Sequence, residues 1–242
     1  PVEVVARLGA REVVEPALEQ GKVDLVPEYL GTALTFLDDA DRVASADPET
    51  THARLRQAFA ARGVSVLAAA PAEDRNGFVV TGDLARRRGL KRISDLAPLA
   101  GRLAFGGPPE CRDRPLCLKG LRDHYGLEFA RFEAMPSRRV TAAALETGEI
   151  DVGMIETTDA SLFKRDLVQL EDDRRLQPAE NVVPVVRRQV VDAHGPALVR
   201  VLDAVSAQLT TVELSGLNRQ VVVDDQPPSA VAAGWLRAHP VT

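Results

Sequence analysis

A nine-residue pattern that occurs twice places the strongest constraint on the fold of this chain. The first copy, at 17–25, reads Ala-Leu-Glu-Gln-Gly-Lys-Val-Asp-Leu, and the second, at 144–152, reads Ala-Leu-Glu-Thr-Gly-Glu-Ile-Asp-Val. Each copy predicts the last turn of a helix, a glycine that ends the helix in the left-handed conformation, and an apolar strand. The sequence therefore predicts two similar α/β units, with a chance match of a common αβ pattern as the alternative.

Both predicted strands run into polar loops. The first continues into Glu-Tyr-Leu-Gly-Thr at 28–32, and the second into Glu-Thr-Thr-Asp at 156–159. In open α/β sheets, ligands bind outside the carboxyl ends of the strands. Two such loop sets could face each other across one cleft, so the pattern predicts a two-lobed binding protein.

Length and charge narrow the class of protein. The 242 residues suffice for one large domain or two small ones, and 45% hydrophobic with 27% charged residues is ordinary for a globular protein. The net charge of -5 gives no electrostatic case for nucleic acid, so we expect no such partner. Acidic residues surround the arginine clusters at 86–88 and 138–139, which we interpret as solvated helix faces.

The beginning of the chain gives a further expectation. The sequence opens at Pro1 without a methionine, already inside a strand-like run at 2–6. We interpret this as a chain whose natural start is missing, and we expect any export signal to lie upstream. No apolar run approaches the roughly 20 residues that a membrane helix needs.

The two cysteines, Cys111 and Cys117, lie close together, and none of the four scattered histidines is beside them. This pattern gives almost no support for a Cys/His metal site, and we expect neither a metal nor a cofactor. A disulfide would close a short loop before a helix and would suit an oxidising compartment. We predict this disulfide, with two free buried thiols as the alternative.

Local patterns predict alternating helices and strands. The predicted helices cover 11–20, 30–37, 48–62, 115–124, 137–147, 196–209, 211–219 and a last segment that ends near 237. The predicted strands cover 23–27, 64–67, 78–81, 103–105, 128–132, 150–155 and 182–186, and the polar stretch 38–46 is expected to be a loop.

Turn-rich connectors at 70–77 and 176–181 flank a self-contained α/β stretch of about 100 residues. We therefore predict a discontinuous lobe I, 1–77 and 183–242, and an inserted lobe II, 78–182. Two crossovers between lobes would form a hinge, and a hinge lets a cleft close around a ligand.

Several segments resemble the substrate-binding proteins of ABC importers for glycine betaine, carnitine and choline. The stretch 24–32 is similar to the family's Pro-Glu-Tyr-Thr-Gly-Thr, and Arg114-Pro115 opens a helix as in the family's Glu-Arg-Pro-Asp-Gly-Leu. The other similar segments are 9–18, 70–72, 170–173 and 184–187, so the resemblance spans nearly the whole chain.

This resemblance implies an α/β, two-lobed type II periplasmic-binding-protein fold with two hinge crossovers. It also implies a monomeric, non-catalytic receptor outside the cytoplasm, in the periplasm or anchored at the cell surface. Such a receptor would deliver a small-molecule solute to an ABC transporter permease.

The resemblance also implies site residues. In the family, aromatic side chains surround a quaternary ammonium group by cation–π attraction, and a basic residue holds the ligand carboxylate. Tyr29 matches a tyrosine of this box, Thr32 matches a nearby hydroxyl, and Arg114 matches the carboxylate-binding arginine. Phe78 stands where the family usually has another tyrosine, and its ring could serve as a wall of the cage.

Carboxylates occupy two further positions of the aromatic box. Glu156, followed by Thr157, begins the stretch that matches the family's Tyr-Ser-Thr-Asp, and Glu180 stands at the tyrosine of its Pro-Pro-Tyr stretch. Because a carboxylate only accepts hydrogen bonds, we predict a polar solute with O–H or N–H donors rather than a simple betaine.

Each site residue also has a purely structural interpretation. Tyr29 could be a half-buried loop residue, Phe78 could be hinge core, and Arg114 could pair only with a neighbouring carboxylate. Glu156 and Glu180 could be solvated groups at the edge of a cleft.

Two other function classes compete with a solute receptor. A ligand-sensing effector domain of a transcription regulator shares the two-lobed architecture, but it would need a helix-turn-helix upstream of Pro1. An enzyme would need a nucleophile with its base, and no such motif is readable, so we expect no catalytic activity.

Overall fold

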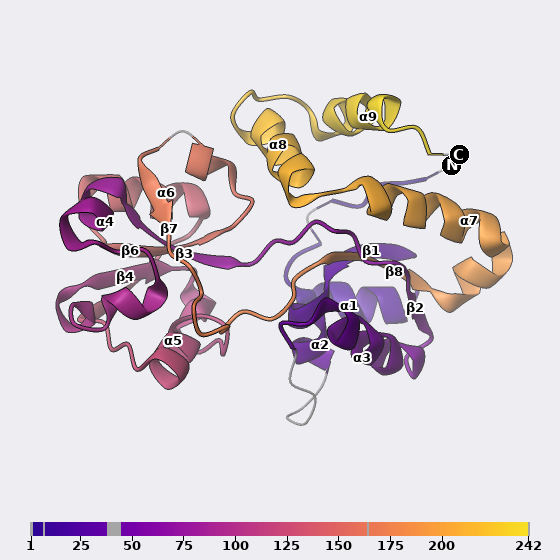
Figure 1. The fold of residues 1–242 in the computed structure, drawn as a ribbon. Helices are drawn as coiled ribbons and strands as arrows, with labels where there is room; N and C mark the ends of the chain where they lie inside the picture. Colours follow the sequence, from indigo (N-terminus) through magenta and orange to yellow (C-terminus); the bar gives the residue numbers. More distant parts are fainter. Residues whose placement is uncertain (1, 7, 38–44, 164, 242) are drawn as a thin grey trace. The chain divides into compact units, whose positions relative to one another are not determined.

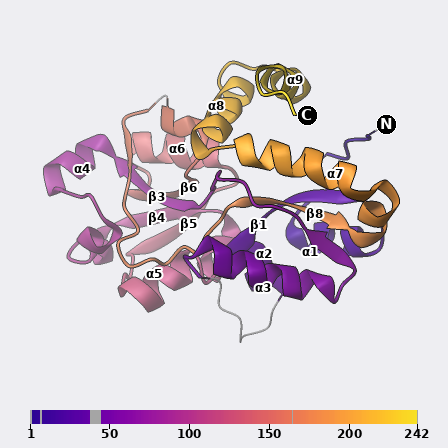
Figure 2. The same ribbon diagram turned by 45° about the vertical axis from the view of Figure 1, so that its right-hand side comes forward.

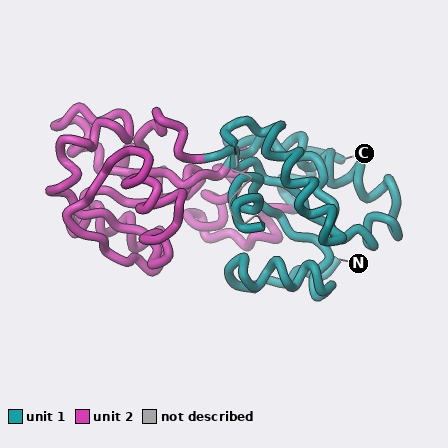
Figure 3. Tube along the Cα trace, turned by 90° about the horizontal axis from the view of Figure 1, so that it is seen from below, with its two compact units in different colours: residues 1–73, 178–211, 233–242 teal, residues 74–177, 212–232 magenta. Residues whose placement is uncertain are grey.

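Two β-sheets organise the structure, a computed structural model that describes residues 2–6, 8–37, 45–163 and 165–241. The chain divides into two compact units: unit 1 comprises residues 1–73, 178–211 and 233–242, and unit 2 comprises 74–177 and 212–232 (Figure 3). The predicted lobes differ from these units by a few residues at the crossovers, 74–77 and 178–182, and at the segment 212–232. This segment belongs to unit 2, where Asn218 donates a hydrogen bond to the carbonyl oxygen of Thr158 over 3.2 Å.

The sheet of unit 1 has its sequence-distant strand in the middle. Strand β8 (Val182–Arg187) pairs antiparallel with β1 (Leu25–Tyr29) on one side and with β2 (Val64–Val66) on the other. Helices α1 (Arg11–Glu19), α2 (Leu30–Leu37) and α3 (Pro48–Ala60) lie against one face of the strands, and α7 (Arg188–Gln208) lies against the other (Figures 1 and 2).

Apolar side chains from helices α1 to α3 and from the strands form the core of unit 1. Its buried members are Leu18, Leu30, Ala33, Leu34, Leu55, Phe59, Val64, Val66, Val183 and Val185. Helix α3 begins as predicted: Asp47 accepts a hydrogen bond from the Thr50 N–H over 2.8 Å, and Pro48 occupies the first turn, where no N–H is needed.

The sheet of unit 2 has five strands in the order β5-β4-β6-β3-β7. Strand β4 (Ala104–Gly107) pairs parallel with β5 (Arg131–Ala134) and β6 (Val152–Glu156). Strand β3 (Asn76–Thr81) pairs antiparallel with β6 and with β7 (Leu167–Gln169). The sheet is therefore mixed, and its parallel part is the βαβ arrangement expected of an α/β fold.

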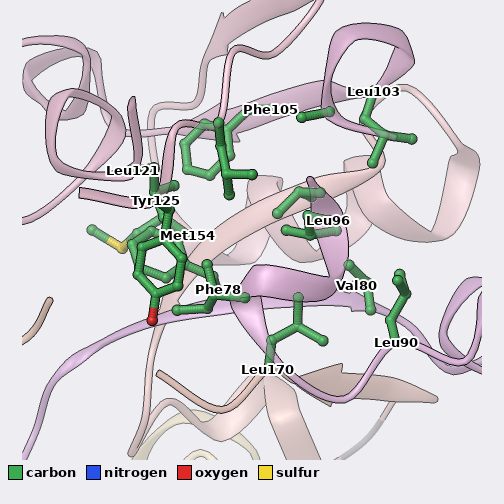
Figure 4. Packing of buried hydrophobic residues seen from close by; sticks show 14 of the residues in the cluster. Phe78, Val80, Leu90, Leu96, Leu103, Phe105, Leu121, Tyr125, Met154 and Leu170 are labelled. Atoms are coloured by element: carbon green, nitrogen blue, oxygen red, sulfur yellow. The ribbon is translucent and has the colours of Figure 1, made fainter. Parts of the chain in front are cut away.

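The two faces of this sheet pack against different helices. Phe78 and Val80 of β3 point to the core that includes Leu121 and Tyr125 of α5 (Leu118–Tyr125), shown in Figure 4. Val79, between them in sequence, belongs to the cluster formed with α6 (Arg138–Thr147). This alternation is the period of two of a strand that is buried on both faces.

The repeated pattern of the sequence forms the same local structure in both units. Gly21 and Gly148 both have left-handed φ angles, of 72° and 74°. In the first copy, the Lys22 N–H donates to the Ala17 carbonyl over 2.8 Å, and in the second, the Glu149 N–H donates to Ala144 over 2.9 Å. The prediction of two helix–glycine–strand units is confirmed, and β1 and β6 follow them.

Some elements differ from the sequence prediction. Residues 2–6 form no strand, and part of the loop expected at 38–46 lies outside the described residues. Helix α4 (Gly82–Arg88) and strand β7 were not predicted, although Thr81 caps α4 by accepting the Leu84 N–H over 3.2 Å. Helix α7 is longer than predicted and is kinked at Gly195, while α8 (Thr211–Val222) and α9 (Pro228–Ala238) match the predicted C-terminal helices.

Cys111 and Cys117 form a disulfide, and their Cα atoms are 5.2 Å apart. Both side chains are buried in the core of unit 2, at the ends of the loop that contains Arg114. The bond therefore closes a short loop before α5, as the sequence predicts.

We expect the Cys111→Ser/Cys117→Ser double variant to lose about 2 kcal/mol of stability, because the bridge restricts a short loop in the unfolded chain. Thermal unfolding of both proteins with and without reductant measures this loss. Reductant should lower the melting temperature of the wild type towards that of the variant, which itself should not respond. Two free thiols in wild-type protein unfolded without reductant would contradict the prediction.

Candidate functional site

In unit 1, three of the predicted site residues come from two segments that meet at the end of β1. Tyr29 is the last residue of β1, and Thr32 lies in the first turn of α2, which follows directly. Both side chains are half-buried. The segment 178–181, which leads into β8, runs beside them, because the N–H groups of Gly31 and Leu30 donate to the carbonyl oxygens of Ala179 and Asn181 over 2.9 and 3.2 Å.

Glu180 is held by the start of α2. Its carboxylate accepts the Thr32 N–H over 3.1 Å and also accepts the Thr32 hydroxyl. The residue is 3% exposed, so the interpretation as a solvated group is wrong. Burial raises the pKa of Glu180 to about 7, although the hydrogen bonds from Thr32 act in the opposite direction.

Gly31 allows this close packing. A Cβ atom at this position would lie 2.4 Å from the Cγ of Pro178 and 2.9 Å from the Ala179 carbonyl oxygen. Any larger residue would therefore push the segment that carries Glu180 away from α2. Gly31 thus allows the segment 178–181 to pack closely against α2, and Thr32 donates the hydrogen bonds that hold Glu180.

A second carboxylate of unit 1, Glu28, is bound by Arg11. The Nε and Nη2 atoms of Arg11 donate to the two carboxylate oxygens over 3.0 and 2.7 Å, and the Glu28 side chain is only 5% exposed. The same carboxylate accepts the Tyr29 N–H over 3.0 Å. Burial would lower the pKa of Arg11, but its hydrogen bonds to Glu28 and the negative charge of that residue raise the pKa above its ordinary value.

Glu15 of α1 is a third buried carboxyl group in this region. It is 2% exposed, and neither oxygen has a hydrogen-bond partner among the described residues. Burial, followed by the charge of Glu28, raises the pKa of Glu15 to about 8. Arg11 and Glu28 act electrostatically on both Glu15 and Glu180, and we call these four residues the Arg11 cluster.

In unit 2, Glu156 ends β6 and pairs with Arg138. The Nε atom of Arg138 donates to Oε1 over 2.7 Å and to Oε2 over 2.5 Å, and Nη2 also contacts Oε1. Their side chains are 31% and 23% exposed for Arg138 and Glu156. The negative charge of Glu156 is therefore balanced within unit 2, and Arg138 is not simply part of a solvated helix face.

Two other predicted residues lie near the same end of this sheet. The hydroxyl of Thr157 accepts the Arg75 N–H over 3.0 Å, and the Thr157 N–H donates to the Arg75 carbonyl over 2.9 Å, which extends the pairing of β3 and β6 by one residue. Arg114 is half-buried in the disulfide loop. That loop is anchored to β3, because the Asn76 side chain donates to the Leu116 carbonyl over 3.0 Å and Asn76 pairs with Glu156 across the strands.

Phe78 has a different environment from the other site candidates. It is 1% exposed, and its ring centroid lies 6.1 Å from that of Phe105 in the core of unit 2 (Figure 4). The ring has no exposed surface with which to form a wall of a ligand cage. Its position supports the core interpretation, and we leave it out of the site that we propose.

Sequence reasoning missed the charged residues that surround the candidate site residues: Arg11, Glu15, Glu28 and Arg138. Arg11 and Glu28 were within segments that resemble the family, but nothing in the spacing of 17 residues indicated that they pair. Arg138 was assigned to a solvated helix face because acidic residues surround its arginine cluster in the sequence. A carboxylate at a strand end, Glu156, was the one signal that a cation would be nearby.

Other kinds of site find no support in the part of the chain that the structure describes. No group of three or more His, Cys, Asp or Glu side chains there could hold a metal ion. No helix in that part is long and apolar enough to cross a membrane.

A family model described as "Substrate binding domain of ABC-type glycine betaine transport system" matches residues 2–238. The glycine-betaine-binding protein of Pseudomonas aeruginosa is 28% identical over 248 residues, which cover 98% of this chain and 78% of that protein. The Helicobacter pylori protein named "Ergothioneine transport permease/ergothioneine binding protein EgtU" is 26% identical over 223 residues, which cover 92% of this chain and 39% of that protein.

Solved structures of substrate-binding proteins are also similar to this chain in fold. A glycine betaine/carnitine/choline ABC transporter structure aligns with a TM-score of 0.80 at 25% identity, covering 96% of this chain and 85% of that one. Apo YehZ from Escherichia coli aligns with a TM-score of 0.72 at 25% identity, covering 97% of this chain and 87% of that one. The fold is thus the two-lobed periplasmic-binding architecture that the sequence predicted.

Proposed function

Because the chain belongs to the substrate-binding domains of ABC-type glycine betaine transport systems, we propose that it is the solute receptor of an ABC importer. It would bind a small solute outside the cytoplasm and deliver it to the permease. It would act as a monomer, without a catalytic step and without nucleic acid. The regulator alternative is not favoured, since the matching family model describes a transport component over almost the whole chain.

The observation that supports a ligand site is the equivalent placement of polar residues at two strand ends. Tyr29 follows the first copy of the repeated pattern and Glu156 follows the second, each as the last residue of its strand. Thr32 and Glu180 lie beside the first, and the loop of Arg114 is anchored beside the second. We propose that the residues of these two groups contact the solute.

The chemistry of these residues favours a polar solute with O–H or N–H donors. Glu156, whose side chain is 23% exposed, provides acceptor oxygens, Tyr29 provides an aromatic face, and Arg114 provides a donor for an acidic group. Glu180, buried behind Thr32, contributes its charge rather than a direct hydrogen bond. The names of the relatives include glycine betaine and ergothioneine, so members with this fold bind chemically different solutes. An amine or aromatic portion in the solute would suit Tyr29.

A thermal-shift screen with betaines, choline, carnitine, amino acids, polyamines and aromatic metabolites tests this function. A solute present at about 100 times its dissociation constant should stabilise the protein by about 2.7 kcal/mol. The Tyr29→Ala variant should lose this shift, because the aromatic face is removed, while its melting temperature without solute stays close to that of wild type. If no solute of these classes shifts the wild type, the proposed receptor function for them is wrong.

We expect glycine betaine itself to bind weakly or not at all. An aromatic box gains up to about 2 kcal/mol for each desolvated cation–π contact, and Tyr29 is the one aromatic residue that we retain at the four box positions. Glycine betaine also has no N–H or O–H donor for Glu156. Isothermal titration calorimetry that finds micromolar affinity would contradict this expectation, and choline, which has a hydroxyl donor and no carboxylate, is the matched comparison.

A further inference from the structure

The Arg11 cluster has more buried negative groups than buried cations. Glu15, Glu28 and Glu180 are 2%, 4% and 3% exposed, and Arg11 is the cation that they share. Arg11 is committed to Glu28 through two hydrogen bonds. Three ionised carboxylates with one arginine would leave a net charge of about −2 in a poorly hydrated place, which is costly unless a proton or another cation enters.

Glu15 is the carboxyl group to which no donor of the described residues is bonded, whereas Glu28 accepts from Arg11 and Glu180 accepts from Thr32. A hydrogen bond with Glu28 favours the protonated form of Glu15, and the charge of Arg11 opposes it. The charged groups that act on Glu15 are Glu28 from β1, with Arg11 and Glu19 from its own helix. Strand β8 also contacts α1, and its Arg187 is bound to Asp24 over 2.9 Å.

We propose that the Arg11 cluster binds a proton that is released when a cationic solute binds beside Tyr29 and Glu180. The positive charge of the solute, placed near Glu180, stabilises the ionised form of the carboxyl groups. The cluster therefore releases a proton as the cation binds, and its net charge stays the same. Arg11 and Glu28 are positioning residues in this scheme, since Glu28 holds the Tyr29 backbone N–H and Arg11 acts on Glu180. The proposal rests on the proposed receptor function and adds to it a charge class of solute and a pH dependence.

The pH dependence follows from the direction of the exchange. Burial raises the pKa of Glu180 to about 7 and that of Glu15 to about 8, so the cluster still holds protons near neutral pH. A cationic solute should therefore bind more tightly as the pH rises through this range. Release of about half a proton per solute corresponds to roughly a threefold gain in affinity per pH unit.

Isothermal titration calorimetry with choline at pH 7, in phosphate and in Tris, measures this release directly. Protons that leave the protein are taken up by the buffer, so the observed enthalpy should differ between the two buffers in proportion to the ionisation enthalpy of each. We expect Glu15→Gln to bind choline with at most half of the wild-type proton release. Glu49→Gln, the same substitution at an exposed position of α3, should leave the release unchanged.

Carbon-13 NMR of glutamate-labelled protein provides a second measurement that does not depend on the variants. A side-chain carboxyl signal of the free protein should titrate above pH 6.5, and saturating choline should shift that midpoint downwards. Choline binding with equal enthalpies in both buffers would overturn the proposal and leave the receptor function intact. If choline does not bind, the proposed proton release on binding of a cation is wrong. The thermal-shift screen then tests the receptor function independently.

Discussion

Replacement of Arg11 by methionine should destabilise unit 1 by about 3 to 5 kcal/mol, the usual cost of removing one partner of a buried ion pair. Arg11 donates two hydrogen bonds to Glu28, whose side chain is 5% exposed. Without the guanidinium, Glu28 would be a buried carboxylate near Glu15 and Glu180 that has lost its cation and keeps the Tyr29 N–H as a donor. Methionine keeps most of the apolar stem, so the loss would report the charge rather than the volume.

Urea unfolding at pH 7, followed by tryptophan fluorescence, measures this effect. Trp235 is the single tryptophan of the chain and lies in unit 1. Arg62→Met is the matched control, because Arg62 pairs with Glu19 at 41% and 32% side-chain exposure, and such a surface pair contributes less than about 1 kcal/mol. If Arg11→Met and Arg62→Met shift the unfolding midpoint equally, the Arg11–Glu28 pair stabilises the protein no more than a surface ion pair does.

Replacement of Glu15 by glutamine should change the pH dependence of stability more than any other single substitution in α1. A carboxyl group whose pKa is about 8 in the folded protein and 4.5 in the unfolded chain holds its proton more tightly in the folded state. Its stabilising contribution is complete below about pH 4.5 and is lost as the pH rises towards 8. Over that range, the loss amounts to a few kcal/mol. Glutamine cannot ionise, so the variant should lack this part of the decline.

The free energy of unfolding of both proteins, measured from pH 5 to pH 9, gives the comparison. Relative to wild type, Glu15→Gln should gain stability steadily with rising pH. Glu180, whose pKa is also raised, still titrates in the variant, so some decline should remain. Glu49→Gln, at an exposed position of α3, should follow the wild-type curve. An unchanged pH profile of Glu15→Gln would mean that Glu15 is ionised in the folded protein.

The local parts of the fold and site were predictable because their signals are local. The glycines at 21 and 148 end their helices as the repeated pattern indicates, and Tyr29 and Glu156 do end strands. The cap at Asp47 and the disulfide between Cys111 and Cys117 also depend on residues close in the sequence.

The partners of the site residues could not be predicted, because they depend on contacts between distant segments. Glu180 bonds to Thr32 across 148 residues, and Arg138 reaches Glu156 from the opposite end of a helix–strand unit. The local sequence around each of these residues does not show which other charged or polar residue it contacts in the folded protein. Only the folded structure shows that Glu156 is neutralised, that Glu180 is buried and that Phe78 is part of the core.

The central place of β8 in its sheet determines the order in which the two units can form during synthesis. Strands β1 and β2 each pair with β8 and not with each other, so the sheet of unit 1 has no strand pair until Val182 has left the ribosome. All five strands of the other sheet lie between Asn76 and Gln169, so that sheet can form first. At roughly 5 to 20 residues per second, the N-terminal segment waits on the order of ten seconds with its apolar strands unpaired. Consider a nascent chain stalled so that Gln169 has emerged from the ribosome and Val182 has not. Its segment 76–169 should be resistant to protease, and the segment that contains β1 and β2 should be cleaved.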